Sequence, residues 1–183
     1  MGIESFELNS TTVFITPITA TSHSRANRIE TQRLAVSQLI ENAGFDPHLL
    51  IRTTKGKPFF LGENQPFISI SHTASYAAIA LSVQPVGLDI EHTSVRTLRV
   101  LPRIINATES ALISFPTDIL SSTKIWCSKE AVFKLYGTLC KTISEVTISS
   151  VTESEAHTAP PFQAKVCFEK KDDLIIALAA MND

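Results

Sequence analysis

The sequence predicts strands and helices arranged in two related halves. Three observations indicate this. Apolar residues alternate with the two-residue period of a strand in Val86–Glu91, they recur at helical spacing in Trp126–Lys134, and one apolar pattern occurs twice. The repeated pattern is YAAIALS from Tyr76 and LIIALAA from Leu174. Each copy closes a block that opens with a strand and continues into a helix. We therefore expect halves of residues 1–84 and 85–183 within one compact unit.

The first half reads as a strand, a helix and a hairpin. The expected elements are a strand at Thr12–Ile18, a helix from about Arg25 to Ala43, a short strand at Leu49–Thr53, and a hairpin of Phe67–His72 with Tyr76–Val83. Ser22 or Ser24 is suited to cap the helix, and Gly44 is placed to end it. Its apolar side is expected to hold Ile29, Leu34, Val36, Leu39 and Ile40.

The second half repeats this order with a longer helical segment. The expected elements are the Val86–Glu91 strand, a helix at Arg96–Ile105, a second helix start at Asn106 or Thr108, a turn at Phe115–Asp118, a helix at Ser121–Gly137, and strands at Thr147–Val151, Gln163–Phe168 and Leu174–Ala180. Gly137 is placed to end the long helix.

The amino-acid composition limits the kinds of protein that this chain can be. The 183 residues are 44% hydrophobic and 19% charged, which favours a sizeable core over disorder. A formal net charge of −2 gives no general reason to expect nucleic acid or a membrane surface as a partner. The histidines and cysteines are too few and too scattered for a zinc pattern. Cys127, Cys140 and Cys167 are odd in number and lack a framework spacing, so we expect free thiols.

Targeting signals are not visible in the sequence. Residues 1–10 lack a basic start followed by an apolar stretch, and no apolar run approaches the roughly 18 residues that span a bilayer. With free thiols, this predicts a soluble, cytoplasmic protein.

Two carboxylates lie on one face of the Val86–Glu91 strand. Successive side chains of a strand point to opposite faces, so Asp89 and Glu91 share one face and the apolar residues share the other. We expect the acidic face to be exposed. Such a pair is most often a solvated strand face; as a site, it would suit Mg²⁺, which prefers oxygen ligands.

A third carboxylate and an ammonium lie on the Ser121–Gly137 helix. Glu130 and Lys134 are four residues apart, hence on one helical face. They fit either an ordinary ion pair on the helix surface or a set of groups that faces the Asp89–Glu91 pair. Similarly, Lys55-Gly56-Lys57-Pro58 is either a solvated loop or a phosphate-binding loop, and His72 at a strand end most often has a structural hydrogen bond.

Taken in order, these motifs resemble those of the 4′-phosphopantetheinyl transferases of the long, single-chain type. The motifs are Gly56-Lys57-Pro58, Ser69-Ile70-Ser71-His72, Val86-Gly87-Leu88-Asp89-Ile90-Glu91, and Trp126-Cys127-Ser128-Lys129-Glu130-Ala131-Val132-Phe133-Lys134. The resemblance covers residues 25–145 well, and the ends of the chain only in general character. The segment before the first helix is shorter than in many long members.

The resemblance implies an α+β fold of two pseudo-symmetric halves with coenzyme A in the cleft between them, acting as a monomer. The implied enzyme is a holo-[carrier protein] synthase. It would move 4′-phosphopantetheine from coenzyme A to a serine hydroxyl of an apo acyl or peptidyl carrier protein, with Mg²⁺, and release adenosine 3′,5′-bisphosphate. The alternatives are a non-catalytic carrier-binding or scaffold protein of the same fold, and another Mg²⁺-dependent nucleotide enzyme. The second would be expected to show a G-x-x-x-x-G-K-[ST] loop, which this sequence lacks.

The resemblance also implies roles for individual residues. Asp89, Glu91 and Glu130 would hold Mg²⁺, and Glu130 would also take the proton from the carrier serine, directly or through water. Lys134 would neutralise phosphate charge. The nucleotide end of coenzyme A, with its 3′-phosphate, would be held by Lys57, Ser71 and His72. Arg25 and Arg28 are further candidates for contact with coenzyme A, and Lys129 has a less certain role. Since carrier proteins are usually acidic, Arg96, Arg99 and Arg103 are candidates for a docking patch. The sequence does not indicate which carrier is the target.

Overall fold

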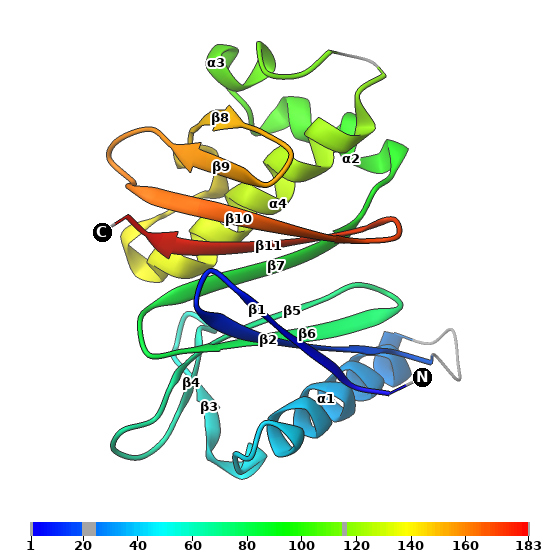
Figure 1. Cartoon of the computed structure of the whole chain (residues 1–183), viewed down its shortest axis with the longest axis vertical. Helices are drawn as coiled ribbons and strands as arrows, with labels where there is room; N and C mark the ends of the chain where they lie inside the picture. Colours follow the sequence, from blue (N-terminus) through cyan, green and yellow to red (C-terminus); the bar gives the residue numbers. More distant parts are fainter. Residues whose placement is uncertain (1, 20–24, 115–116, 183) are drawn as a thin grey trace.

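Two β-sheets lie between two long helices in the computed structural model, which describes residues 2–19, 25–114 and 117–182. The first sheet has the strand order β1-β2-β6-β5, and the second has the order β7-β11-β10-β9-β8 (Figure 1). The helix α1 covers the first sheet, and α4 covers the second. Ser22, Ser24 and part of the Phe115–Asp118 turn lie outside the described residues.

The first sheet and its helix come from residues before Gln84. The elements are β1 (Glu4–Leu8), β2 (Thr11–Pro17), α1 (Arg25–Asn42), η1 (Pro47–Leu49), β3 (Leu50–Arg52), β4 (Pro58–Phe60), β5 (Phe67–His72) and β6 (Tyr76–Ser82). β3 and β4 form a separate two-stranded sheet. The predicted strands and hairpin are confirmed, whereas the sequence patterns missed the short strands β1 and β4.

The second sheet and its helices come from the remaining residues. The elements are β7 (Val86–His92), α2 (Val95–Val100), η2 (Leu101–Arg103), α3 (Ala107–Ser110), α4 (Ile119–Tyr136), η3 (Gly137–Leu139), η4 (Ile143–Glu145), β8 (Ile148–Val151), β9 (Glu155–Thr158), β10 (Ala164–Lys171) and β11 (Leu174–Met181). Of the two expected starts for α3, Asn106 is the N-cap, in a capping box with Glu109. The strand β9 was not predicted.

The core has three apolar layers, and β6 and β11 each contribute to two of them. The layer between the sheets contains Ala78 and Ala80 of β6, together with Leu174, Ile176 and Leu178 of β11. The alternate residues of β6 face α1, and those of β11 face α4. Both faces of each strand are therefore buried, which explains why these two segments are continuously apolar and resemble each other.

One expectation about α1 is wrong in part. Val36, Leu39 and Ile40 are buried as predicted, but Leu34 and Ile29 are 56% and 40% exposed. Leu34 lies two residues from Val36, which is about 200° around a helix, so it points away from the sheet. At its C-terminus, α1 ends as expected, with Gly44 at φ 86°.

The three cysteines are free, as expected. Cys127 is buried in the core under α4, and burial, followed by the charge of Asp89, raises the pKa of its thiol. It is a packing residue. Among the described helices, none combines the length and apolar character needed to cross a bilayer.

Candidate active site

The site is built where α4 crosses β7. Val86, Leu88 and Ile90 of β7 face the core between the sheets, so Gly87, Asp89 and Glu91 face the other way. A Cβ atom at Gly87 would lie 1.9 Å from the carbonyl oxygen of Ala131 in α4. The absence of a side chain at Gly87 therefore allows the helix backbone to lie directly on the strand, next to Asp89.

Asp89 is buried and only partly satisfied. It is 4% exposed, and its Oδ1 accepts hydrogen bonds from Ser71 Oγ at 2.8 Å and Lys134 Nζ at 2.7 Å. Its Oδ2 is buried without a partner. The expectation of an exposed acidic face is thus wrong for Asp89, because α4 and β5 cover it. A buried, unpaired carboxylate oxygen is costly and would gain from a cation.

Lys134 crosses from α4 to β7. Besides Asp89 Oδ1, its Nζ donates to Ser71 Oγ at 3.1 Å and to the carbonyl oxygen of Leu88 at 2.9 Å. Among the described residues, its ion pair is with Asp89 and not with Glu130. This observation contradicts the interpretation of Glu130 and Lys134 as an ordinary ion pair on the helix surface.

Glu91 and Glu130 share the electrostatic environment of Asp89. Burial, followed by the charge of Asp89, raises the pKa of both carboxyls. The charge of Glu91 adds to the rise at Glu130, whereas Lys134 opposes it. Glu91 Oε1 also accepts a hydrogen bond from the Trp126 indole at 3.0 Å. The charge of Asp89 thus disfavours the ionisation of both Glu91 and Glu130, an effect that a bound cation would reverse.

These residues fit a magnesium site in chemistry but do not form a closed ligand set. Within the described parts of the chain, no group of three or more His, Cys, Asp or Glu side chains is arranged to hold a metal ion. The unpaired Asp89 Oδ2 and the raised pKa values of Glu91 and Glu130 are the observations that fit a hard cation.

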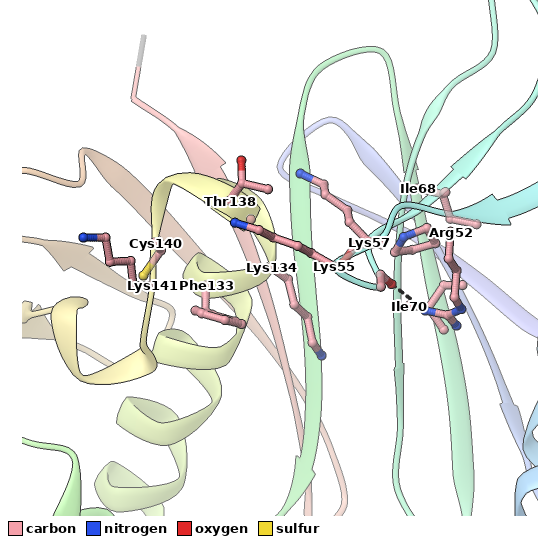
Figure 2. Close-up of a pocket in the computed structure, with 14 residues that line it drawn as sticks. Arg52, Lys55, Lys57, Ile68, Ile70, Phe133, Lys134, Thr138, Cys140 and Lys141 are labelled. Carbon is pink, nitrogen blue, oxygen red and sulfur yellow. Dashed lines mark hydrogen bonds between the residues drawn. The ribbon is translucent and has the colours of Figure 1, made fainter.

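A basic pocket of about 490 Å³ is lined in part by Lys134, the ion-pair partner of Asp89 (Figure 2). It lies between the β3–β4 loop, β5 and the C-terminal end of α4. Its charged lining residues are all cationic: Arg52, Lys55, Lys57, Lys134 and Lys141. Figure 2 shows Lys55 and Lys57 extending from the loop across the opening towards α4. The pocket thus has the charge of an anion-binding site.

Lys57 joins the two parts of the molecule. Its Nζ donates to the carbonyl oxygen of Leu135, near the C-terminal end of α4, at 3.0 Å. Burial lowers the pKa of this ammonium. The loop is held in shape by Gly56, at φ 86°, whose carbonyl oxygen accepts from Arg52 Nη1 at 2.9 Å. These contacts show that the loop is held in place by the protein and is not freely solvated.

The structure separates His72 from Lys57. His72 ends β5 and lines a second cavity, formed with α1 and β3, whereas Lys57 lines the basic pocket. The two cavities share Arg52 and Ile70. Partial burial lowers the pKa of His72, and the charges of Lys134 and Arg52 add to this effect. Ser71, in contrast, lies at the centre of the site, bonded to Asp89 and Lys134.

Sequence reasoning missed Arg52 and Lys141 as pocket residues. Each is a single basic residue in a short loop or strand end, without a motif. Lys129 is fully buried in an ion pair with Glu109, 2.6 Å from its Oε1. The Lys129 side chain thus points towards Glu109 of α3. Arg25 and Arg28 are exposed on the first turn of α1 and do not line either cavity.

Comparison with known proteins adds an independent finding. Residues 85–179 match the family model of the 4′-phosphopantetheinyl transferase superfamily, a span of more than half of the chain. The chain belongs to this superfamily. The match contains both β7 and α4, so it covers the carboxylates and Lys134. The resemblance noted from the motifs is confirmed, and the chain is placed among the transferases.

The chain is also similar to a curated protein, enterobactin synthase component D of Salmonella austin. The two are 29% identical over 157 residues, which cover 74% of this chain and 67% of the relative.

Proposed function

We propose that this protein transfers 4′-phosphopantetheine from coenzyme A to a serine hydroxyl of an apo carrier protein, in a Mg²⁺-dependent reaction that releases adenosine 3′,5′-bisphosphate. The observation that carries the proposal is the buried Asp89. One of its oxygens is paired with Lys134 and the other is free, beside a pocket lined only by cations among its charged residues. This arrangement suits a dianionic diphosphate with a metal ion.

The proposed chemistry is attack of an alcohol on a phosphoanhydride. The carrier serine Oγ bonds to the phosphorus that bears pantetheine, and the bond from that phosphorus to the leaving adenosine 3′,5′-bisphosphate breaks. Such a reaction needs positioning and charge stabilisation more than covalent help from the protein. Glu130 would accept the serine proton, directly or through water. Lys134 would neutralise charge on the phosphates.

Asp89, Glu91 and Glu130 are the residues that would hold Mg²⁺. When bound, the ion would offset the charge of the diphosphate. Lys57, Ser71 and His72, with the newly located Arg52, would hold the nucleotide end. The closeness of Ser71 to Lys134, at 3.1 Å, supports a continuous path from the carboxylates to the pocket.

The pseudo-symmetric arrangement is part of the proposal. In each sheet, the strand that closes the half (β6 or β11) lies between an earlier strand of the same half (β2 or β7) and its hairpin partner (β5 or β10). This shared order supports halves of residues 1–84 and 85–183. The basic pocket is lined by residues of both halves, which supports a cleft between them as the active site.

The exposure of three arginines supports a docking patch for the carrier protein. Arg96, Arg99 and Arg103 are all exposed on α2 and η2, the segment that directly follows the acidic strand. None is in an ion pair among the described residues. An acidic carrier docked there would lie next to Glu91.

The test is to mix the protein with coenzyme A, Mg²⁺ and several apo carriers, and to weigh the carriers by mass spectrometry. We expect at least one carrier to gain the mass of one phosphopantetheine group. Asp89→Asn is the control, because it keeps the shape of the side chain but removes its charge. A carrier that binds without gaining mass, under all conditions tested, would contradict the proposal and favour the non-catalytic carrier-binding alternative.

A further inference from the structure

The two sheets meet at β5 and β7 without a backbone ladder. β5 is the last strand of the first sheet, and β7 is the first strand of the second. The two strands lie side by side but do not pair. The N–H groups on the outer side of β7 therefore have no strand partner, although they are buried between the two halves.

Two serines of β5 take the place of the missing ladder. Ser69 Oγ accepts a hydrogen bond from the N–H of Leu88 at 2.8 Å, and Ser71 Oγ accepts one from the N–H of Ile90 at 3.2 Å. Both serines are buried, at 4% and 5% exposure. The two-residue spacing of the serines matches that of the amides, so the pair of bonds sets one register between the strands.

These two bonds bracket Asp89. Leu88 precedes Asp89 and Ile90 follows it, so the backbone on both sides of the carboxylate is held to β5. The carbonyl of Leu88 also accepts from Lys134 Nζ at 2.9 Å. The Leu88 residue is thus fixed by Ser69 at its N–H and by Lys134 at its C=O. Ser71 has two further partners in the site, whereas the Leu88 amide is the hydrogen-bond partner of Ser69 among the described residues.

We propose that Ser69 is a positioning residue for Asp89. It acts through the Leu88 amide and sets where the carboxylate meets Lys134 and the metal. Its effect on turnover rests on the proposed function. Its effect on metal binding rests on the proposed metal site, and its effect on the strand rests on neither proposal. Ser69 also lines the basic pocket, so direct contact with coenzyme A is the competing explanation.

The experiment compares Ser69→Ala, Ser69→Cys and Ser69→Thr in the full chain. Alanine removes the acceptor, cysteine weakens it, and threonine keeps the hydroxyl oxygen. Ile79→Val is the control, because it trims one methyl from the same sheet on the face towards α1. Three quantities are measured: hydrogen exchange at the Leu88 amide, Mn²⁺ affinity by electron paramagnetic resonance, and kcat and KM for coenzyme A with an accepted carrier.

In Ser69→Ala, we expect the Leu88 amide to exchange about tenfold faster and Mn²⁺ to bind about tenfold more weakly, as for the loss of one buried hydrogen bond. The kcat should fall by a similar factor while the KM for coenzyme A changes less than about twofold. Across the three variants, Mn²⁺ affinity and kcat should follow the protection of the Leu88 amide. If one variant does not fold, the relation between Leu88 protection, Mn²⁺ affinity and kcat in the other two variants still tests the proposal.

Several results would overturn the proposal. Normal Mn²⁺ affinity with an unprotected Leu88 amide would show that Ser69 does not position Asp89. A rise confined to the KM for coenzyme A would show direct contact with the substrate. Equal losses of amide protection, Mn²⁺ affinity and kcat in Ile79→Val would show that these losses follow from lower overall stability. If wild-type protein transferred nothing to any carrier, the proposed function would fail, while exchange and Mn²⁺ binding would still decide the role of Ser69.

Discussion

Asp89 is the residue whose environment departs most from the expectation for its type. Carboxylates are rarely buried without full pairing, and here one oxygen has two donors while the other has none. In a protein without ligands, such an oxygen lowers stability. In a complex with a cation, it would become a ligand. Its burial and its incomplete hydrogen bonding together distinguish Asp89 from an acidic residue on a solvated strand face.

Replacing Asp89 should separate charge from hydrogen bonding. Asp89→Asn and Asp89→Ala should both lower turnover by orders of magnitude, because the metal loses a ligand. Only Asp89→Ala also removes the acceptor of the Ser71 hydroxyl and one of the three acceptors of Lys134, so it should lower the free energy of unfolding by a further 1–3 kcal/mol or so. Turnover at several Mg²⁺ concentrations and urea unfolding measure the two effects. Near-normal turnover of Asp89→Asn at limiting Mg²⁺ would remove Asp89 from the site.

The substitution Glu130→Gln should lower activity but raise the stability of the metal-free protein at high pH. Glu130→Gln should lower kcat by about 10²–10⁴-fold, and coenzyme A affinity much less, because it removes the base. In metal-free protein the raised pKa means that folding disfavours the ionised carboxyl. The ionised form therefore costs stability above the raised pKa, and the cost disappears as the pH falls below the ordinary value, where both states are protonated.

Urea unfolding with a chelator at pH 8 and at pH 3.5 or so checks this sign. Glu130→Gln should be more stable than wild type at pH 8, and the gain should vanish at the acidic pH. A variant that is less stable than wild type at pH 8, with unchanged kcat, would instead indicate a structural role for Glu130.

The nucleotide end can be tested with dephospho-coenzyme A, which lacks the 3′-phosphate. Wild-type protein should use it less well, mainly through a higher KM. Lys57→Ala and His72→Ala should each reduce the preference by about tenfold, because charged hydrogen bonds to phosphate are lost. The measurement is kcat/KM for both donors. Lys165→Ala, on the distant strand β10, is the control.

If neither variant changes the preference for coenzyme A, these residues do not contact the 3′-phosphate. If only one does, it identifies which of the two cavities that share Arg52 holds this group.

At the scale of elements, the contact of α4 with β7 determines the site. The helix supplies Glu130 and Lys134, and the strand supplies Asp89 and Glu91. They approach closely because Gly87 has no side chain, and its ideal Cβ would lie 1.9 Å from Ala131 O and 2.7 Å from Leu135 N. Backbone atoms cannot rotate out of the way as side chains do, so the helix as a whole would have to move.

Gly87→Ala should therefore displace α4 from β7. We expect a loss of 1–3 kcal/mol or more in the free energy of unfolding, as for overpacking in a core. We also expect a fall in kcat by at least about tenfold, since small misplacements of catalytic groups are costly. Gly44→Ala is a useful comparison, because it strains a turn far from the site without meeting any atom within 4 Å. Wild-type kcat in Gly87→Ala would show that the close approach is not needed.

At the scale of the whole molecule, charge is distributed unevenly although the net charge is small. Cations line the basic pocket and also occur on α2: Lys134 of the pocket pairs with Asp89, and the charge of Arg96 on α2 acts on Glu91. This arrangement would attract anionic partners to both cationic regions. Such a distribution would let a chain with a formal net charge of −2 bind the two anionic partners of the proposed function.

Charge reversal on α2 tests the proposed carrier side of this arrangement. Arg96→Glu with Arg99→Glu should raise the KM for an acidic carrier by about tenfold or more at low salt and leave the KM for coenzyme A unchanged. The effect should shrink as salt screens the exposed charges. Lys170→Glu, an exposed residue of β10, controls for the change in net charge. A similar rise in the KM for coenzyme A would show instead that the α2 arginines act on coenzyme A as well as on the carrier.

The sequence by itself determined the longer helices and strands and the types of residue that form the candidate site. Period-two and helical spacing identified the acidic strand, the long helix and the two strands that are apolar on both faces, because local periodicity reflects which faces are buried. Ordered motifs around Asp89, Glu130 and Lys134 were enough to indicate the family, since their chemistry depends on residue types at fixed spacings.

Only the tertiary structure decided how these groups are paired. Local spacing placed Lys134 next to Glu130, one helical turn away, but its ion pair is with Asp89, 45 residues distant in the sequence. The burial of Asp89, the pocket residues Arg52 and Lys141, and the bond from Ser69 to Leu88 likewise depend on segments that meet only after folding. The physical reason is that burial and ion pairing are set by which elements come together in space, and neither is encoded in the period of a single segment.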